Sequence, residues 1–355
     1  MPALAARHAC LAKRWLVVSL VSGQVVFSGH FSNACVASQM NIDKNTEKSL
    51  VVRVMRRLRR LILGDRRLLP GYLADAMWHV ESMRSRIRGG ELVVRFDNLD
   101  ADVCLDARSD LAARALGEGV YEPELVNLLP EVVGEKDVIN VGANVGVIAI
   151  VIRRAMTAGS RLLCVEPMPE CIERLQRNLE AAAVDQGVLI ERAFATDQAI
   201  SSQTMWTVPG RPEYSSGGKL VHSSVCSAEH VTIGVPTIRL DEAIASHGLQ
   251  PSAIVMDCEG GELAALRGAT AVLARYKPTI VLEFVSQLLE ANGGSAAGLL
   301  AFLREQGYQC LTCEENPEEV TADFSGTVVA VPVGRAECVS RAINSAFTRT
   351  GSATA

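Results

Sequence analysis

The sequence predicts an α/β fold built on a mostly parallel, doubly wound sheet. Short apolar runs alternate with stretches of helical periodicity from about residue 118 to residue 332. Residues 138–150, "VINVGANVGVIAI", read as a buried strand, a tight glycine turn and the start of a helix. The last two apolar runs are joined only by a turn-rich acidic loop, 314–325, so we expect them to pair antiparallel at one edge of the sheet.

Length and composition are those of a packed globular protein. The chain has 355 residues, of which 48% are hydrophobic and 21% charged, enough for one large domain with an extension. The net charge of −5 provides no global basic field, so no nucleic-acid partner is expected. Ten cysteines are scattered, several inside apolar runs, which fits buried thiols in a reducing compartment. We therefore expect a cytoplasmic location.

Residues 1–49 are predicted to be an N-terminal extension, either a mis-set start or a weak signal-like segment. Lys13 and Arg14 precede an apolar stretch that is too short and too interrupted to span a bilayer. Met40 begins a second plausible protein start, so residues 1–39 are interpreted as dispensable rather than as a working signal.

Residues 50–117 are predicted to hold a basic amphipathic helix and a small hairpin. In 50–63, "LVVRVMRRLRRLIL", an apolar stripe lies opposite four arginines. Such a helix either rests on an anionic membrane surface or packs its stripe on the main domain, and the second arrangement is the commoner one. The run 91–107 alternates like two strands joined by a turn.

The main domain is predicted to span residues 118–335. A helix over 121–133 leads into the glycine turn. The expected strands are 137–141, 161–166, 188–194, 253–258, 278–284, 308–313 and 326–332, and the expected helices are 146–156, 169–183, 262–275 and 297–306. Residues 197–236, rich in Ser, Gly and Pro, are interpreted as a substrate lid or as a decorative hairpin insertion. Residues 336–355 are expected to form a flexible C-terminal tail.

The glycine turn indicates a ligand site at the carboxyl end of its strand. Its spacing is neither the Rossmann GxGxxG nor a phosphate-binding P-loop. It presents backbone N–H groups at a helix start, which suit a carboxylate or one modest anion. Asn140, Gly142, Asn144 and Gly146 are therefore candidate cofactor-binding residues.

An acidic residue at the end of the next strand indicates an adenosine ligand. Glu166 follows Gly146 by 20 positions, where a carboxylate can accept hydrogen bonds from both ribose hydroxyls, and Met168 can cover an adenine face. S-adenosylmethionine fits a turn with only two glycines, because it has no diphosphate for the turn to accommodate. NAD is the competitor, but its diphosphate prefers a fuller glycine pattern.

The stretch "DCEGGE" places three acids on one short turn after an apolar strand. Asp257 and Glu259 are the first candidates for a catalytic base, with Asp257 also placed near the cofactor, and His222 is the third. The competing interpretation is that they cap the turn and the following helix. Glu262 is explained structurally, because acids are favoured in a first helical turn.

Other polar residues have simpler interpretations. Asp241 is expected to cap a helix, and Glu283 ends a strand on the ligand side, with function and structure equally plausible. Cys310 and Cys313 form a lone CxxC that we interpret as two strand thiols, because no further metal ligands accompany it. No metal site is expected.

Five blocks in order and spacing resemble the FkbM-type S-adenosylmethionine-dependent methyltransferases: "VINVGANVG", "VEPMPECIERLQRNLE", "TIRLDEAI", "MDCEGGELAALRGA" and "PTIVLEF". The resemblance covers about residues 118–332. It implies a class I methyltransferase (Rossmann-like) sheet of seven strands and O-methyl transfer to a hydroxyl of a saccharide, glycolipid or polyketide-type metabolite. Two positions depart from the family pattern, since Asn140 replaces an aspartate and Val255 a common lysine.

Two other functions stay open at the sequence level. An NAD-linked nucleotide-sugar oxidoreductase would need a fuller glycine loop and usually a Tyr-x-x-x-Lys pair, which is not found. A degenerate methyltransferase fold could serve as a binding module, for which Asn140 is the best support. The sequence leaves the acceptor and the oligomeric state open.

Overall fold

The computed structural model describes residues 16–21, 24–31, 34–40, 90–107, 109–117, 119–208, 211–218 and 230–353, which fall into two units divided after Pro70. In the first unit, three strands form an antiparallel sheet in the order β1 (Leu16–Val21), β2 (Gln24–Phe31), β3 (Ala34–Met40). The sequence predicts this segment only as an extension. The basic helix predicted over 50–63 lies outside the described residues.

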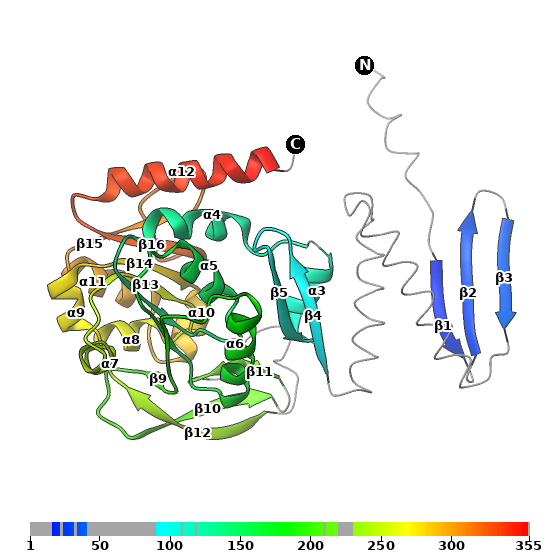
Figure 1. Ribbon diagram of the computed structural model, residues 1–355, viewed down its shortest axis with the longest axis horizontal. Coiled ribbons are helices and arrows are strands. Elements are labelled where there is room, and N and C mark those ends of the chain that lie inside the picture. Colours follow the sequence, from blue (N-terminus) through cyan, green and yellow to red (C-terminus); the bar gives the residue numbers. More distant parts are fainter. Residues whose placement is uncertain are drawn as a thin grey trace, which may run out of the picture. The chain divides into compact units, whose positions relative to one another are not determined.

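The second unit is built on a seven-stranded sheet (Figure 1). Its order is β15-β16-β14-β13-β6-β7-β8, with bounds Tyr308–Thr312, Gly326–Pro332, Thr279–Phe284, Pro251–Met256, Asp137–Val141, Leu162–Val165 and Val188–Glu191. Strand β16 is antiparallel to both neighbours, and the other pairs are parallel. The predicted mostly parallel sheet with an antiparallel terminal pair is confirmed.

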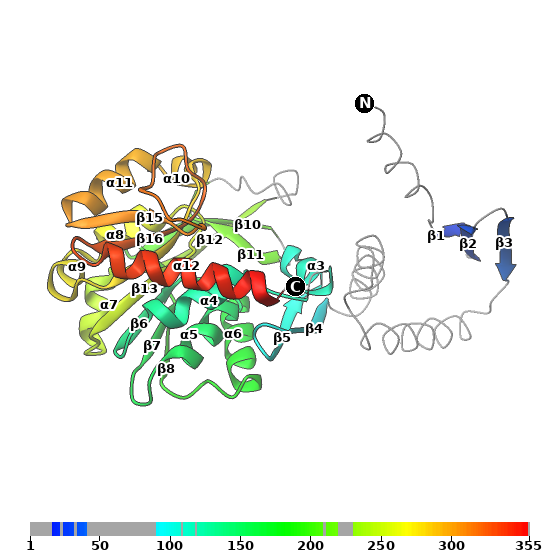
Figure 2. The ribbon, with the colours of Figure 1, turned by 90° about the horizontal axis from the view of Figure 1, so that it is seen from above.

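Helices cover both faces of this sheet (Figures 1 and 2). One face carries α4 (Pro123–Val132), α5 (Val147–Ala155), α6 (Pro169–Ala181) and α12 (Ala336–Ala353). The other carries α7 (Leu240–Ser246), α8 (Glu262–Arg267), α9 (Thr270–Tyr276), α10 (Ser286–Ala291) and α11 (Ala296–Glu305). Successive strand residues enter opposite cores, as Val138 and Ile139 do, because side chains alternate across a strand.

The C-terminal segment is a helix, so the prediction of a flexible tail over 336–355 is wrong for residues 336–353. Val339, Ile343 and Ala346 of α12 are buried in the same core as α4, and the two helices lie side by side (Figure 2). The spacing of these three residues is that of an apolar helix face, a signal that the sequence analysis overlooked.

The hairpin belongs to the main domain, so the predicted boundary at residue 117 is also wrong. Strands β4 (Glu91–Phe96) and β5 (Ala101–Asp106) and helix α3 (Asp110–Gly117) lie where the hairpin was expected. Phe96 and Leu105 are buried in the core shared with α4 and α5. The Asn178 side chain of α6 accepts a hydrogen bond from Cys104 N at 2.7 Å and donates one to Cys104 O at 3.1 Å, which ties the hairpin to α6.

The helix predicted over 262–275 is two helices, α8 and α9. They are separated at Gly268, where an added Cβ would lie 2.5 Å from Thr196 O. The chain can therefore approach the loop after β9 only without a side chain there. Asp241 accepts hydrogen bonds from Ala271 N at 3.1 Å and Val272 N at 2.9 Å. It caps a helix as predicted, but the helix is α9 rather than its own, α7.

Residues 197–236 contribute most of a second, smaller sheet. Its order is β11-β10-β12-β9, with bounds Arg211–Ser216, Ser202–Val208, Val231–Ile238 and Phe194–Ala195. Strand β9 continues the run predicted as one strand over 188–194. His222, the third candidate base, lies outside the described residues.

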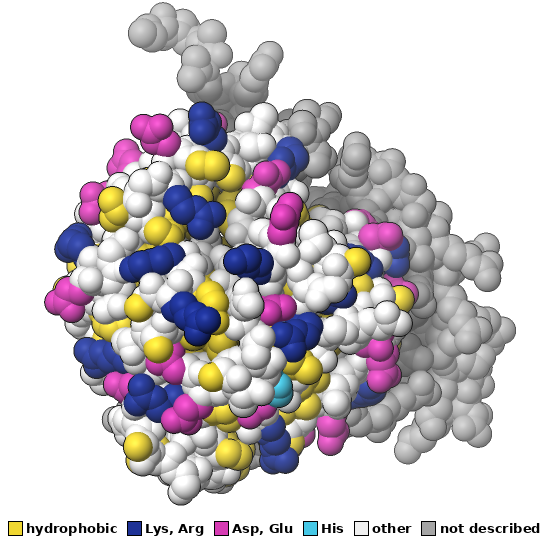
Figure 3. Space-filling view, turned by 60° about the vertical axis from the view of Figure 1, so that its left-hand side comes forward, with side chains coloured by type: hydrophobic (Ala, Val, Ile, Leu, Met, Phe, Trp, Pro, Cys, Tyr) yellow, Lys and Arg dark blue, Asp and Glu magenta, His cyan; other side chains and the backbone are white. Residues whose placement is uncertain are grey.

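Three further features of the described residues bear on function. None of their helices is long and apolar enough to cross a membrane. On the face shown in Figure 3, basic and acidic side chains are interspersed rather than gathered by sign. The two thiols of the CxxC lie against opposite cores, Cys310 on one side of the sheet and Cys313 on the other, so they do not form a paired site.

Candidate active site

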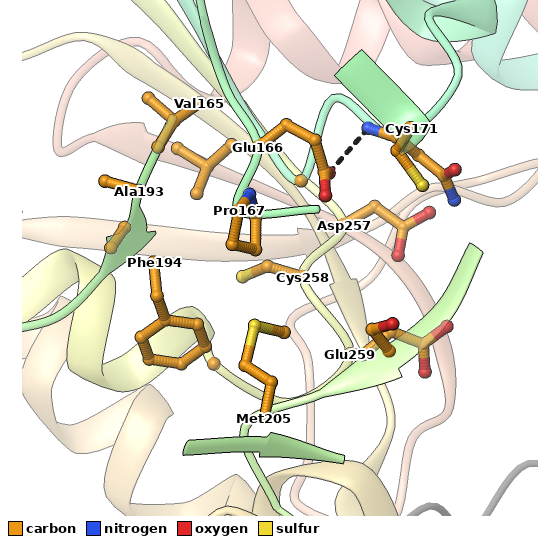
Figure 4. Close-up of a pocket in the computed structure, with 16 residues that line it drawn as sticks. Val165, Glu166, Pro167, Cys171, Ala193, Phe194, Met205, Asp257, Cys258 and Glu259 are labelled. Carbon is orange, nitrogen blue, oxygen red and sulfur yellow. Dashed lines mark hydrogen bonds between the residues drawn. The ribbon is translucent and has the colours of Figure 1, made fainter. Parts of the chain in front are cut away.

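A cavity opens at the carboxyl ends of β6, β7 and β13 (Figure 4). It brings together five of the predicted site residues: Gly142, Asn144, Glu166, Asp257 and Glu259. Its apolar lining includes Cys171, Phe194, Met205 and Cys258, none of which the sequence analysis had singled out as a site residue. Cys171, Phe194 and Met205 come from α6, β9 and β10. No local sequence pattern specifies how these segments are placed against the main sheet. Figure 4 shows Phe194 and Met205 across the cavity from Glu166.

The glycine turn packs closely on the end of β13. Gly142 has a φ of 76°, and a Cβ there would lie 1.8 Å from Asp257 O. Asn144 has a φ of 48°, a conformation that asparagine tolerates better than most residues. Gly146, with a φ of 92°, lets α5 start against Leu175 of α6. The turn therefore needs its glycines to bring β6 and β13 together beside the cavity.

Glu166 is held by two backbone N–H groups. Its Oε2 accepts a hydrogen bond from Asn144 N and its Oε1 one from Met168 N, both at 2.9 Å (Figure 4 marks the first). The side chain is 5% exposed. Burial raises the pKa of Glu166 to about 7, and the two N–H donors act in the opposite direction. Each carboxylate oxygen keeps a second lone pair for a ligand donor.

Asn140, Gly146 and Met168 do not line the cavity. Asn140 is 1% exposed on β6, where its Nδ2 donates weakly to Val255 O at 3.4 Å and its Oδ1 has no partner among the described residues. Met168 packs its side chain beside Cys171 and Met205, and only its backbone N–H serves the site. The structure thus places these three candidates behind the cavity wall.

Two acids from neighbouring strand ends meet beside the cavity. Asp257 follows β13 and Glu283 lies in β14, in adjacent register because Met256 pairs with Leu282. Their carboxyl groups are close enough for each to shift the pKa of the other. Desolvation by the surrounding wall, with each acid's negative neighbours, raises the pKa of the half-buried Glu283 to about 7. It also raises the pKa of Asp257 above its usual range, although Asp257 is itself exposed to solvent. The prediction left Glu283 open, and the structure joins it to Asp257.

Glu259 is a third acid of this group and has an unusual backbone. Its φ is 54°, in the left-handed region that glutamate adopts infrequently. Burial, then the charges of Asp257 and Glu262, raises its pKa to about 8. Glu262 lies in the first turn of α8, as predicted, and its Oε1 also accepts hydrogen bonds from Cys258 N and Gly260 N, at 3.1 and 3.3 Å, so it holds the preceding turn.

Positive charge is absent from the wall of carboxyls that the structure describes. None of the ion pairs among the described residues involves Asp257, Glu259 or Glu283. Glu122, before α4, adds a further negative charge near Asp257, although Arg114 lies 3.5 Å from it. The described residues also contain no group of three His, Cys, Asp or Glu side chains arranged to hold a metal ion. The arrangement can accept protons and hydroxyl hydrogen bonds.

A comparison with protein families matches residues 140–310 to the Methyltransferase FkbM domain. The chain contains an FkbM methyltransferase domain. The match begins at Asn140 in β6 and ends at Cys310 in β15, so it spans the turn, Glu166 and the three acids. It confirms the resemblance, and the strand order described above is the class I methyltransferase sheet that the resemblance implied.

Solved structures give more distant matches. An FkbM methyltransferase from Methylobacillus flagellatus is 16% identical, with 63% of this chain and 55% of that chain covered and a TM-score of 0.35. The O-methyltransferase TomG from Streptomyces achromogenes, in complex with SAM, is 14% identical, with 73% and 98% covered and a TM-score of 0.38. An O-methyltransferase from Bacillus cereus, in complex with SAH, is 14% identical, with 59% and 80% covered and a TM-score of 0.36. The match with the first of these spans about half of that protein's length, and no curated protein matches.

Proposed function

We propose that this protein is an S-adenosylmethionine-dependent methyltransferase that O-methylates a hydroxyl of a saccharide, glycolipid or polyketide-type metabolite. The observation that carries the proposal is the place of Glu166 inside an FkbM domain. Its buried carboxylate is fixed between the glycine turn and Met168, at the strand end where a ribose diol is bound in related sheets. A cytoplasmic location and peripheral membrane contact through residues 50–63 are part of the proposal.

The residues fit an adenosyl ligand in chemistry. The two oxygens of Glu166 retain acceptor capacity for two hydroxyls, and Cys171, Phe194 and Met205 supply apolar surface for a base. The cavity has a volume of about 50 Å³, far below the roughly 300–1,000 Å³ of pockets that bury a small molecule. We expect the side chains of Phe194 and Met205, which form its cover, to move when a ligand enters.

S-adenosylmethionine, when bound, supplies an electrophilic methyl group. The protein's part is to hold the acceptor oxygen in line, exclude water and take up the hydroxyl proton. Asp257 and Glu259 line the cavity, and Glu283 lies beside Asp257 on the neighbouring strand. Carboxyl groups with pKa values near 7 to 8 are stronger bases than ordinary carboxylates, which suits an alcohol that must lose its proton during transfer.

The same carboxyls favour a neutral, hydroxyl-rich acceptor. Carboxyl groups exchange hydrogen bonds with sugar hydroxyls. A phosphate or carboxylate on the acceptor would find no cationic partner beside Asp257 and Glu259 and would be repelled by whichever of them is ionised. The absence of ion pairs to these acids among the described residues leaves nothing there to offset that repulsion. We therefore expect acceptors whose reacting end is uncharged or cationic.

Incubation of the purified protein with methyl-labelled S-adenosylmethionine and fractionated glycans, glycolipids and polyketides tests the proposal. Label transferred to an alkali-stable ether supports O-methylation. Calorimetric titration with S-adenosylhomocysteine and, separately, with NAD⁺ distinguishes the alternatives. Binding of NAD⁺ in place of the adenosyl ligand would point to the oxidoreductase, and binding of neither ligand would reject the assignment of this cavity.

A further inference from the structure

One side-chain amide outside the cavity joins three segments of the chain. Asn292 follows α10, and its Nδ2 donates hydrogen bonds to Glu259 O at 2.8 Å and to Leu288 O at 3.0 Å. It also lies 3.3 Å from Ser216 Oγ, at the end of β11. Ser216 Oγ in turn donates to Glu259 O at 3.2 Å. The turn after β13, the end of β11 and the end of α10 therefore meet at one carbonyl, that of Glu259.

Three glycines make room for this amide. An added Cβ at Gly260 would lie 2.6 Å from Asn292 Nδ2 and 2.1 Å from Leu288 O. At Gly217 it would lie 3.1 Å from Asn292 Oδ1, and at Gly218 it would lie 3.1 Å from Asn292 Cγ and 2.2 Å from Ala291 O. Backbone packing this close restricts the positions open to the half-buried Asn292 side chain.

The carbonyl held in this way belongs to a residue of the cavity with a strained backbone. A left-handed conformation at a residue other than glycine persists only when its surroundings over-determine it. At Glu259, with a φ of 54°, the surroundings are Asn292 and Ser216 on its carbonyl oxygen. This conformation sets the direction in which the Glu259 side chain leaves the turn, and that side chain lines the cavity.

We propose that Asn292 is a positioning residue, which acts through the Glu259 carbonyl to keep the Glu259 carboxyl group in the cavity and to tie the end of β11 to the same turn. The role of Glu259 in methyl transfer rests on the proposed function, whereas its placement by Asn292 does not.

A purely structural role for Asn292 would be to end α10. That role needs only the bond to Leu288 O, four residues earlier in the chain. The hydrogen bond from Asn292 to Glu259 O is the shorter of the two and joins residues 33 positions apart in the chain. Ser216, at the end of β11, also donates to Glu259 O, and the capping of α10 does not require this second donor.

The first test follows the Glu259 carboxyl directly, without any ligand. Protein labelled with ¹³C at the glutamate carboxyl carbon is titrated by NMR, and the Glu259 signal is identified by its loss in Glu259→Gln. In Asn292→Ala, and in Asn292→Leu, which keeps the approximate size but removes the N–H donors without adding charge, the Glu259 midpoint should fall by about one pH unit as the turn relaxes toward solvent. Asn344→Ala is the matched control, because Asn344 accepts from Asn316 N at 2.9 Å far from the cavity.

The second test is a double-mutant cycle on methyl transfer. If Asn292 acts through Glu259, Asn292→Ala should lower kcat about tenfold in the wild type with little change in KM, yet not at all in a Glu259→Gln background. An unmoved Glu259 titration, or an equal fall of kcat in both backgrounds, would overturn the proposal. Should Asn292→Ala fail to fold, Ser216→Ala weakens the same carbonyl contact and is expected to move the titration in the same direction by a smaller amount. Absence of methyl transfer in the wild type would defeat the proposed function but leave the titration result standing.

Discussion

The Oε2 atom of Glu166 accepts a hydrogen bond from Asn144 N at 2.9 Å, which joins the acidic end of β7 to the turn after β6. Since Met168 N holds the other oxygen, the carboxylate is fixed before any ligand arrives. A pre-positioned acceptor loses little conformational freedom on binding, so more of the hydrogen-bond energy appears as affinity. The link also means that the glycine turn and the acid act as one unit.

Glu166→Ala should weaken binding of S-adenosylhomocysteine by at least about tenfold, because hydrogen bonds to a charged acceptor contribute about 1.5–3 kcal/mol each. Isothermal titration calorimetry measures the change. Glu191→Ala is the control: Glu191 ends the neighbouring strand β8, where it faces His247 at 3.6 Å rather than the cavity. Equal affinities of Glu166→Ala and the wild type would contradict the place given to the ribose.

Methyl transfer should accelerate as pH rises from 6 to 9. A carboxyl base works only when deprotonated, and the pKa values of Glu283 and Glu259 are raised to about 7 and about 8. The logarithm of kcat should therefore climb through this range and level off above it. Glu259→Gln is expected to lower the plateau by about 10²-fold or more if Glu259 is the base. A rate that is flat between pH 6 and 9 would exclude both carboxyls as the base.

The acids beside the cavity should make the protein less stable at alkaline pH. The pKa of the half-buried Glu283 is raised to about 7 from its ordinary value of 4.5, so the folded state binds its proton more tightly than the unfolded chain does. The stability gained in this way is fully present below pH 4.5 and is lost as pH rises through 7. Glu283→Gln should therefore be more stable than the wild type at pH 8.5, by up to about 3 kcal/mol, and similar at pH 4.5.

Urea unfolding at the two pH values measures this difference. Glu305→Gln, an exposed position on α11, is the control and should follow the wild type at both pH values. A constant offset between Glu283→Gln and the wild type at the two pH values would mean that Glu283 is not buried as a neutral acid.

The alternation of apolar strands and amphipathic helices was sufficient to predict the main sheet. Strands and helices repeat their apolar residues with different periods along the sequence, because each buries its own face or faces. The same reasoning failed where an element depends on a distant partner. Helix α12 packs on α4, which lies more than 200 residues earlier, and β4–β5 join a core made by α4 and α5. A local pattern could suggest these elements, but it could not specify what they cover.

Site residues that lie at the ends of apolar strands could be predicted from the sequence. Glu166, Asp257 and Glu259 all follow or end apolar strands, and parallel strands gather such residues at one edge of the sheet. Asn140 was predicted to bind the cofactor, but its side chain is buried within the sheet beside Val255 and does not line the cavity. The sequence does not show this burial. Asn292 was not identified because its partner, the Glu259 carbonyl, is a backbone group with no sequence signature.

The contact between the glycine turn and β13 can be tested by two alanine substitutions. Gly142 and Gly159 both have positive φ, 76° and 93°, so both replacements carry a conformational cost of about 1 kcal/mol. Only at Gly142 would the new Cβ collide, 1.8 Å from Asp257 O, whereas nothing lies within 4 Å at Gly159. Gly142→Ala should therefore lose about 1–3 kcal/mol more than Gly159→Ala in urea unfolding. It should also weaken S-adenosylhomocysteine binding, since relief of the collision must move either the turn that holds Glu166 or the segment that carries Asp257. Similar losses of stability in the two variants would show that the turn does not pack on β13 as described.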